Sequence, residues 1–322
     1  MDPSAGRVGI LGLGAVAVDD LLFLEEFPRP DSKMQVKGRE RHRGGLTGTA
    51  LVAASRMGGS CAYAGSLGDD ELSAFIIEGF RAEGISVAHV SRHPGARPFH
   101  STILVDTHAR TRTILFSAEG VVGADPSAPA EEVIRSARVL FVDHVGLEGM
   151  VRAAGIARRA GVPVVADLER GDSPLFEELL GLVDHLILPF EFARGLSRGT
   201  DGPEVARGLW TDRRAAVVVT RGAEGSWYLS AEEPGRVFHQ PAFRVDVVDT
   251  NGCGDVFHGA YAAFLAEGMP VARRVRAAAA VAAQKAARAG GQQGIPSRGE
   301  AGRFLEEREG EASRREVGGG AA

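Results

Sequence analysis

Short runs of Val, Ile and Leu alternate along this chain with longer Ala-rich stretches, and this alternation restricts the fold more than any other feature. The apolar runs read as strands and lie at residues 7–14, 61–68, 138–144, 162–167, 185–189 and 215–220. The stretches between them have helical spacing and end in Gly or small residues, and they lie at 47–59, 69–84, 147–161 and 172–183. Buried parallel strands covered by helices produce such a pattern. The sequence therefore predicts an α/β fold with a doubly wound and mostly parallel sheet.

Two segments, 15–43 and 97–117, interrupt this rhythm. The second contains "HSTILVDTHARTRTILFS", two β-type runs around a polar turn, which predicts a hairpin. We expect the two segments to form one small antiparallel sheet beside a core made of residues 1–14, 44–96 and 118–310. Residues 311–322 are polar and Gly-rich, so we expect a disordered tail there.

Composition restricts the partners and the compartment. Among 322 residues, 37 Lys and Arg face 42 Asp and Glu, and the net charge of −5 disfavours nucleic acid or an anionic membrane as a partner. The two cysteines, Cys61 and Cys253, disfavour a disulfide scaffold and fit a reducing compartment. No run of about 18 apolar residues predicts a membrane span. We expect a cytoplasmic protein whose partners are small soluble molecules.

The stretch "VVDTNGCGDVFHGAY", residues 247–261, carries the clearest chemical signal. Residues 243–249 alternate as a strand would, and a helical pattern runs from Asp255 to Gly268. The turn between them offers the free amides of Gly252, Cys253 and Gly254 at the positive end of a helix, where a phosphate would bind. Asp255 would repel that phosphate but could accept a proton from a hydroxyl attacking it. The competing interpretation is a capping Asp after an ordinary Gly-rich turn. A P-loop is disfavoured because no GK[ST] follows.

The same stretch resembles the C-terminal signature of the PfkB (ribokinase-like) carbohydrate kinases, with Cys253 in place of the customary Ala. Residues 41–70, "RHRGGLTGTALVAASRMGGSCAYAGSLGDD", resemble the N-terminal signature, and the resemblance covers about residues 8–297. It implies a Rossmann-like, ribokinase-like α/β core with a small β-sheet lid over a sugar site. It also implies ATP and Mg²⁺ as cofactors, and it leaves open whether a monovalent cation is needed.

The resemblance implies catalytic roles for four residues. Asp255 matches the general base, and the amides of Gly252, Cys253 and Gly254 match an anion hole for the transferred phosphoryl group. Cys253 would contribute through its backbone, so a side chain other than Ala is compatible with this role. A thiol at a helix N-terminus often has a lowered pKa, so a catalytic cysteine is a minor alternative.

On the substrate side, the resemblance implies a sugar site. Its candidates are Asp19, with Asp20 as the competing choice, together with Lys33, Gly44, Gly45, Thr49 and Arg112. Leu46 and Thr49 stand where the family has Asn, so the sugar contacts should differ from those of simple ribokinases and fructokinases. Lys33 and Arg112 are lone basic residues of a kind that is more often solvated.

On the nucleotide side, the matching positions are Thr220, Gly222, Gly225, Gln284 and Gly291. Glu191 matches the acidic position of an element that orders Mg²⁺ through water, while Leu188 stands where that element has Asn. Close packing of an Ala-rich helix is the alternative role for the region around Gln284.

The resemblance thus implies an ATP-dependent kinase that phosphorylates a hydroxyl of a small sugar, a ketohexose or a derivative of one. The alternatives are a nucleoside kinase or a sulfofructose kinase of the same family, and a noncatalytic sugar- or nucleotide-binding protein. The small sheet would leave one face to bury, which predicts a homodimer through the lid.

Overall fold

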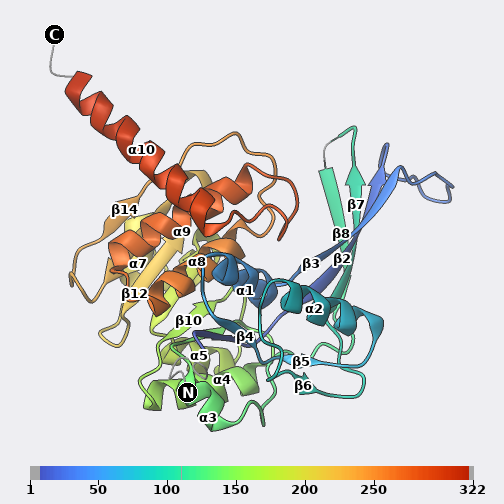
Figure 1. Ribbon diagram of the computed structural model, residues 1–322, viewed down its shortest axis with the longest axis horizontal. Helices are drawn as coiled ribbons and strands as arrows, with labels where there is room; N and C mark the ends of the chain where they lie inside the picture. The colour runs from blue at the N-terminus through green and yellow to red at the C-terminus, as the bar shows by residue number, and fades with distance from the viewer. Residues whose placement is uncertain (1–7, 110, 319–322) are drawn as a thin grey trace.

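The computed structural model of the chain describes residues 8–109 and 111–318. Within them, eight strands form one large sheet (Figure 1), in the order β14 (Phe238–Gln240), β13 (Ser226–Ser230), β12 (Ala216–Thr220), β11 (His185–Pro189), β10 (Val164–Asp167), β9 (Val139–Val142), β1 (Ile10–Gly12) and β4 (Cys61–Tyr63). The strands from β12 to β4 are parallel, and β13 and β14 are antiparallel additions at one edge. The predicted α/β fold is therefore confirmed.

Helices cover both faces of this sheet (Figure 1). One face packs against α1 (Leu46–Arg56), α8 (Cys253–Ala266) and α9 (Val271–Ala286), with α2 (Glu71–Ala82) and α10 (Arg298–Gly318) beside them. The other face packs against α3 (Glu131–Ser136), α4 (Leu147–Arg159), α5 (Pro174–Leu182), α6 (Phe190–Ser197) and α7 (Gly202–Gly208). Phe141 and Val142 of β9 point to opposite faces, and both are buried. This is why the parallel strands read as continuous apolar runs.

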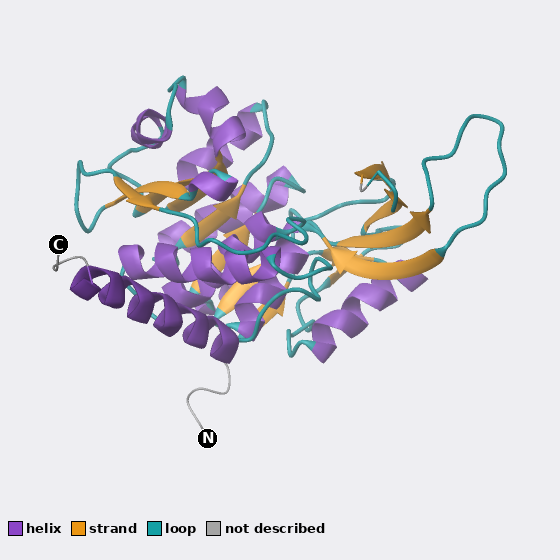
Figure 2. Ribbon diagram, turned by 90° about the horizontal axis from the view of Figure 1, so that it is seen from above, coloured by secondary structure: helices purple, strands orange, loops and turns teal. Residues whose placement is uncertain are grey.

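A small sheet stands to one side of the large one (Figure 2). Its order is β3 (Gly38–Gly44), β2 (Ala17–Leu24), β7 (Phe99–Asp106) and β8 (Thr111–Ser117). The two segments that interrupt the α/β pattern thus supply its strands, apart from Gly44 at the end of β3, and the predicted hairpin is β7–β8. The β2–β7 pair is parallel, so the sheet is mixed rather than wholly antiparallel. A further pair, β5 (Ser66–Leu67) and β6 (Ser91–Arg92), lies apart from both sheets.

One local prediction is wrong. Residues 243–249 form no strand, because the backbone N–H groups of Val248 and Asp249 donate to the carbonyl of Ala286, at the end of α9. Val247 and Val248 are exposed, so the alternation marked no buried face. Residues 311–318 of the tail expected to be disordered belong to α10, and residues 319–322 lie outside the described residues, so disorder of the tail stays a prediction.

None of the helices formed by residues 8–109 and 111–318 is both long and apolar enough to cross a bilayer.

Close packing of α1 against α8 sets the position of α8, the helix that follows the glycine-rich motif. A Cβ added to Gly259 of α8 would collide with the backbone of Ala50 in α1. The two helices therefore approach more closely than a side chain at this position would allow.

Gly259→Ala should lower the free energy of unfolding by about 1–3 kcal/mol, because an extra methyl forces a packed interface apart. Gly302→Ala is the matched control, since a Cβ on this α10 glycine would meet nothing within 4 Å. The control should be neutral or stabilising by roughly 0.5–1 kcal/mol through helix propensity. Urea unfolding midpoints would measure both changes. Equal midpoints for Gly259→Ala and the unmodified chain would contradict the account of this interface.

Candidate active site

The glycine turn, residues 252–254, lies at the N-terminus of α8, at the edge of the large sheet where the parallel strands end. Gly252 precedes the helix with φ 76°, a left-handed conformation that favours glycine. A Cβ placed on Gly252 would lie 3.5 Å from Thr49 Cγ2 and 3.7 Å from Asp255 Oδ2. The structure thus brings together Thr49 from one family-like signature and Asp255 from the other. The N–H of Cys253 donates to the carbonyl oxygen of Thr250 at 3.3 Å, so this amide is not free, contrary to the prediction from the sequence. Helix N-terminal amides beside a carboxylate can bind an anion and remove a proton next to it.

Negative charge surrounds Asp255. Burial raises the pKa of Asp255 well above its ordinary value, and the nearby carboxylates of Asp167 and Glu169 raise it further. Asp167 ends β10, is 2% exposed and has its pKa raised in the same way, by burial and then by Glu169 and Asp143. Like charges in one site do not ionise together. The two carboxyl groups therefore titrate as a coupled pair, and burial together with their mutual repulsion raises both pKa values.

His258 supports the turn from inside the protein. Its Nδ1 lies 2.8 Å from the carbonyl oxygen of Gly254 and 3.4 Å from Asp167 Oδ2, and its Nε2 lies 3.0 Å from the carbonyl oxygen of Ile187 in β11. Burial holds the pKa of His258 below its usual value. The buried imidazole therefore connects the start of α8 to the ends of β10 and β11.

Cys253 does not have the lowered thiol pKa that its place at a helix N-terminus suggests. Burial raises the pKa of the thiol, the carboxylates of Asp249 and Asp255 raise it further, and Lys285 offsets only part of this. Its Sγ points to the carbonyl oxygen of Asp249, 4.0 Å away. The thiol is therefore a poor nucleophile, and its environment favours a backbone role for Cys253.

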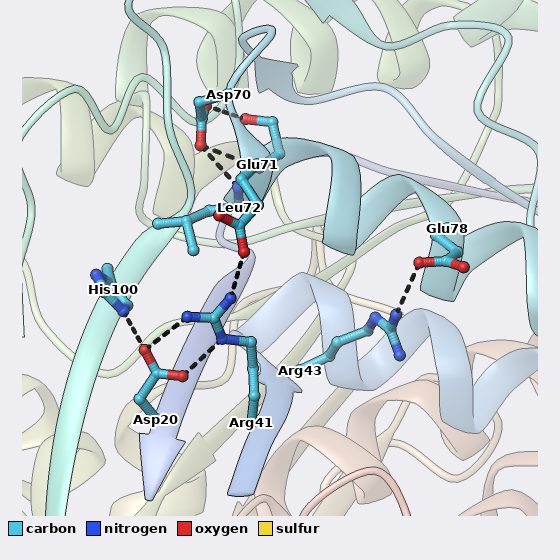
Figure 3. A network of polar contacts seen from close by, with 9 residues as sticks. Asp20, Arg41, Arg43, Asp70, Glu71, Leu72, Glu78 and His100 are labelled. Atoms are coloured by element: carbon cyan, nitrogen blue, oxygen red, sulfur yellow. Dashed lines mark hydrogen bonds and ion pairs between the residues drawn. The ribbon is translucent and has the colours of Figure 1, made fainter.

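The geometry separates Asp19 from Asp20. Asp20 forms an ion pair with Arg41 (Nε–Oδ1 2.6 Å) and contacts His100 Nε2 at 2.7 Å, while Arg41 also reaches Glu71 (Figure 3). This pairing lowers the pKa of Asp20. Asp19 lies on the other face of β2, and burial raises its pKa despite a hydrogen bond from Ser101. Asp19 therefore has the freer carboxylate for a ligand.

The remaining sugar-side candidates divide into those near Asp19 or the glycine turn and one far from both. A Cβ on Gly44 would lie 2.9 Å from Asp19 Oδ2, and one on Gly45, where φ is 89°, would lie 2.5 Å from Val16 Cα. Arg112 of β8 lies 3.9 Å from Asp249 Oδ1, close to the glycine turn. Lys33 is exposed in the loop between β2 and β3, which extends away from the core (Figure 2).

A cavity of about 340 Å³ opens where the small sheet meets the edge of the large one. Phe99 of β7 lines it on one side, and His144, Val145 and Arg170 line it on the other. Arg170 Nε lies 3.1 Å from His144 Nε2, and burial together with Arg170 lowers the pKa of His144 to about 4. The imidazole is therefore neutral at pH 7, and Arg170 supplies the cationic group of this wall.

The nucleotide-side candidates have unequal surroundings. Thr220 ends β12, and Gly222, with φ 48°, has open space around its Cβ position. Gly291 lies next to the glycine turn, since its Cβ position is 3.8 Å from Asn251 Nδ2. A Cβ on Gly225 would collide with the carbonyl of Gln240, so close packing alone explains a glycine at this position. Gln284 is buried, and its amide donates to the carbonyl of Ala280 at 3.4 Å.

Metal-ligand candidates are sparse. Glu191 is 73% exposed in the first turn of α6 and forms an ion pair with Arg194 at 3.0 Å. Among the described residues, no group of three or more His, Cys, Asp or Glu side chains is placed to hold a metal ion. The oxygen donors at the strand ends suit Mg²⁺, which binds proteins through one or two carboxylates and takes its other ligands from phosphates and water.

Sequence reasoning missed Asp167, Glu169, His258 and Lys285. Asp167 had a signal, because it ends an apolar run, and ligand sites of open α/β sheets lie at the carboxyl ends of the strands. His258 and Lys285 lie inside helical patterns, where nothing in the sequence distinguishes a buried polar side chain from a solvated one.

Comparison with known proteins gives a consistent result. The family model described as pfkB family carbohydrate kinase matches residues 10–298. A ribokinase of Haemophilus influenzae is 27% identical over 308 residues, covering 91% of this chain and 97% of that protein. Fructokinase-1 of Zea mays is 27% identical over 278 residues, covering 80% and 83%. The structure of Arabidopsis thaliana ribokinase complexed with ribose and ATP superposes with a TM-score of 0.82 at 20% identity, covering 93% of this chain and 99% of that one.

Proposed function

The chain belongs to the pfkB family of carbohydrate kinases, and from this premise we propose that it transfers the γ-phosphoryl group of ATP to a hydroxyl of a small sugar, with Asp255 as the general base. One observation carries the proposal: Asp255, Thr49 and the backbone amides of the glycine turn meet at the N-terminus of α8, where the N–H of Cys253 also donates to the carbonyl oxygen of Thr250 at 3.3 Å. Enzymes catalyse phosphoryl transfer mainly by positioning the reactants and by stabilising the charge on the transferred group, and this arrangement is suited to both.

The surroundings of Asp255 suit proton removal from an alcohol. A base works best when its pKa lies near the working pH, and burial with Asp167 and Glu169 raises the pKa of Asp255 in that direction. The amides of Gly252, Cys253 and Gly254 would receive the charge that develops on the transferred group. Mg²⁺ bound to the nucleotide phosphates would neutralise part of their charge, and Glu169 and Glu191 are the carboxylates we propose to face it.

Asp19 would orient the sugar. Its carboxylate packs against Gly44, where a side chain would collide with it, and a carboxylate can accept hydrogen bonds from two neighbouring hydroxyls. The cavity beside Phe99 has the size of a small-ligand site. A ketohexose is our leading substrate class, and the named relatives make ribose the second.

Turnover should be found in a panel of ketohexoses, ribose, sulfofructose, polyols, sugar phosphates and nucleosides with MgATP. Asp255→Asn should lower it by roughly 10²–10⁴-fold while the protein still binds ATP, because only the base is lost. Asp246→Asn, an exposed aspartate in the loop before the glycine turn, is the matched control and should keep wild-type turnover. ADP release would measure all three proteins.

Undiminished turnover of Asp255→Asn would refute its role as base. ATP binding without turnover on any sugar would favour the noncatalytic alternative.

On the acid side of the pH profile of kcat/KM, the apparent pKa should lie above the ordinary pKa of an aspartate. Asp255 must lose its proton to act, and its pKa is raised. Glu169→Gln removes one neighbouring negative charge and should lower that apparent pKa by roughly one unit. Glu178→Gln, on the exposed face of α5, is the control and should leave the apparent pKa unchanged. An unchanged apparent pKa in both variants would mean that the charge of Glu169 does not act on Asp255.

Dimerisation through the small sheet stays a prediction. It is supported by edge strand β8, where Ile114, Leu115 and Phe116 are 47%, 56% and 63% exposed, so both faces of the strand are uncovered. We expect a dimer in sedimentation at micromolar protein. Phe116→Asp should give monomers, and Val247→Asp, equally exposed but outside the small sheet, should not. A single species of monomer mass for the unmodified chain would refute the prediction.

A cytoplasmic location remains our proposal too. It is supported by Cys61 and Cys253 both being free thiols, and a disulfide between them in protein isolated without reductant would contradict it.

A further inference from the structure

Lys285 is a charged side chain that the proposed reaction does not use, and it is 0% exposed. It lies in the last turn of α9, next to Gln284, in the Ala-rich stretch whose other members are mostly packing residues. An ammonium group is costly to bury unless it is paired and hydrogen-bonded. Its position therefore depends on what it contacts.

The contacts of Lys285 are with Asp249, three residues before the glycine turn. Its Nζ donates to the backbone carbonyl oxygen of Asp249 at 2.8 Å and lies 3.4 Å from the carboxylate oxygen Oδ2 of the same residue. Cys253 Sγ approaches the same carbonyl oxygen at 4.0 Å. The ammonium thus binds the backbone and the side chain of one residue at the entrance to the turn.

This contact matters because the segment before the turn has no strand partner. It is held instead by α9: the N–H groups of Val248 and Asp249 donate to the carbonyl of Ala286 at 2.8 and 3.1 Å. Lys285, the preceding residue of α9, adds the link from its side chain. Asp249 Oδ1 in turn accepts from the N–H of Asn251 at 2.9 Å. The end of α9 therefore holds Asp249 in place, and Asp249 in turn positions the amides of the glycine turn.

Charge gives Lys285 a second effect. The carboxylate of Asp249 lies close to the place where we expect the phosphoryl group, and it would repel that group if it were uncompensated. The buried Lys285 places a positive charge on the interior side of this carboxylate. On its solvent side, Arg112 Nη1 lies 3.9 Å from Asp249 Oδ1. The positive end of α8 is thereby kept free to act on the ligand.

We propose that Lys285 is a cation built into the chain that positions and neutralises the segment leading to the glycine turn, so that the kinase needs no monovalent cation from solution. Lys285 is a positioning residue, since it acts through Asp249 and does not touch the substrates. The inference rests on the proposed kinase activity for its kinetic readout. Its thermal readout is independent of that activity.

The test compares Lys285→Met, which fills the space without a charge, with Lys285→Ala, which leaves a space lined by the carbonyl and carboxylate oxygens of Asp249. Both should lower kcat by roughly 10–100-fold with a change in the KM for ATP of less than about 3-fold, because displaced or charge-repelled amides weaken the transition state most. Lys37→Ala is the matched control, since Lys37 is an exposed lysine paired with Glu25, and it should keep wild-type kcat.

Restoring activity with added cations tests whether the charge of Lys285 matters or only its packing. Ammonium or potassium chloride at about 100 mM should restore the kcat of Lys285→Ala by roughly tenfold relative to choline chloride of equal ionic strength, because oxygen ligands bind hard cations. The same salts should not rescue Lys285→Met. Wild-type kcat should vary by less than about 2-fold across lithium, sodium, potassium, ammonium and choline, since ionic strength is held constant.

Melting temperatures in the same salts give the second readout. Lys285→Ala should melt higher in ammonium or potassium than in choline, and Lys285→Met should not, because only the former leaves a site that a cation can fill. If wild-type protein phosphorylates nothing in the substrate panel, the proposed function fails, and this comparison alone decides the role of Lys285.

Three results would overturn the proposal. They are wild-type kcat in folded Lys285→Met, identical cation responses of Lys285→Ala and Lys285→Met in both readouts, and a wild-type kcat that rises several-fold with potassium. The last result needs no variant, so the proposal stays testable if the variants do not fold.

Discussion

Asp255 stands in the first turn of α8, beside the helix's N-terminal amides, and the carboxylates of Asp167 and Glu169 lie near enough to raise its pKa. The amides attract an anion, and the carboxylates repel it and one another. The outcome of this opposition is a carboxyl group whose pKa is raised beside helix-terminal amides, as our proposal of a base next to a phosphate site requires. A loss of the amides would leave repulsion alone, and a loss of the carboxylates would leave an anion site with nothing to remove a proton.

The fold keeps these groups in place through contacts that are distant in sequence. Gly259 lets α8 pack directly on α1, which brings Thr49 beside Gly252. His258 joins the start of α8 to the strand ends, and the end of α9 holds Asp249. The turn is therefore fixed from the sheet side by His258 and from the helix side by Lys285, and the small sheet adds Asp19 and Arg112 from outside.

Sequence alone predicted the parts of this arrangement that follow from local pattern. The apolar runs predicted the buried parallel strands, and the Gly-rich motif predicted a helix start with Asp255 in its first turn. The alternation in residues 243–249 failed, because their hydrogen bonds go to α9 rather than to a neighbouring strand. The raised thiol pKa of Cys253 and the burial of Lys285 depend on which elements meet, and such tertiary contacts leave no periodic signal in a single sequence.

The central claim is that Asp255 removes a proton while the phosphoryl group passes directly from ATP to the sugar. The stereochemistry at phosphorus tests this most directly, with ATP made chiral at the γ-phosphate by oxygen isotopes. One in-line displacement inverts the configuration, and the account predicts inversion. Retention would mean two displacements through a phosphorylated enzyme, which would make a side chain such as Asp255 or Cys253 a nucleophile and contradict its assignment here.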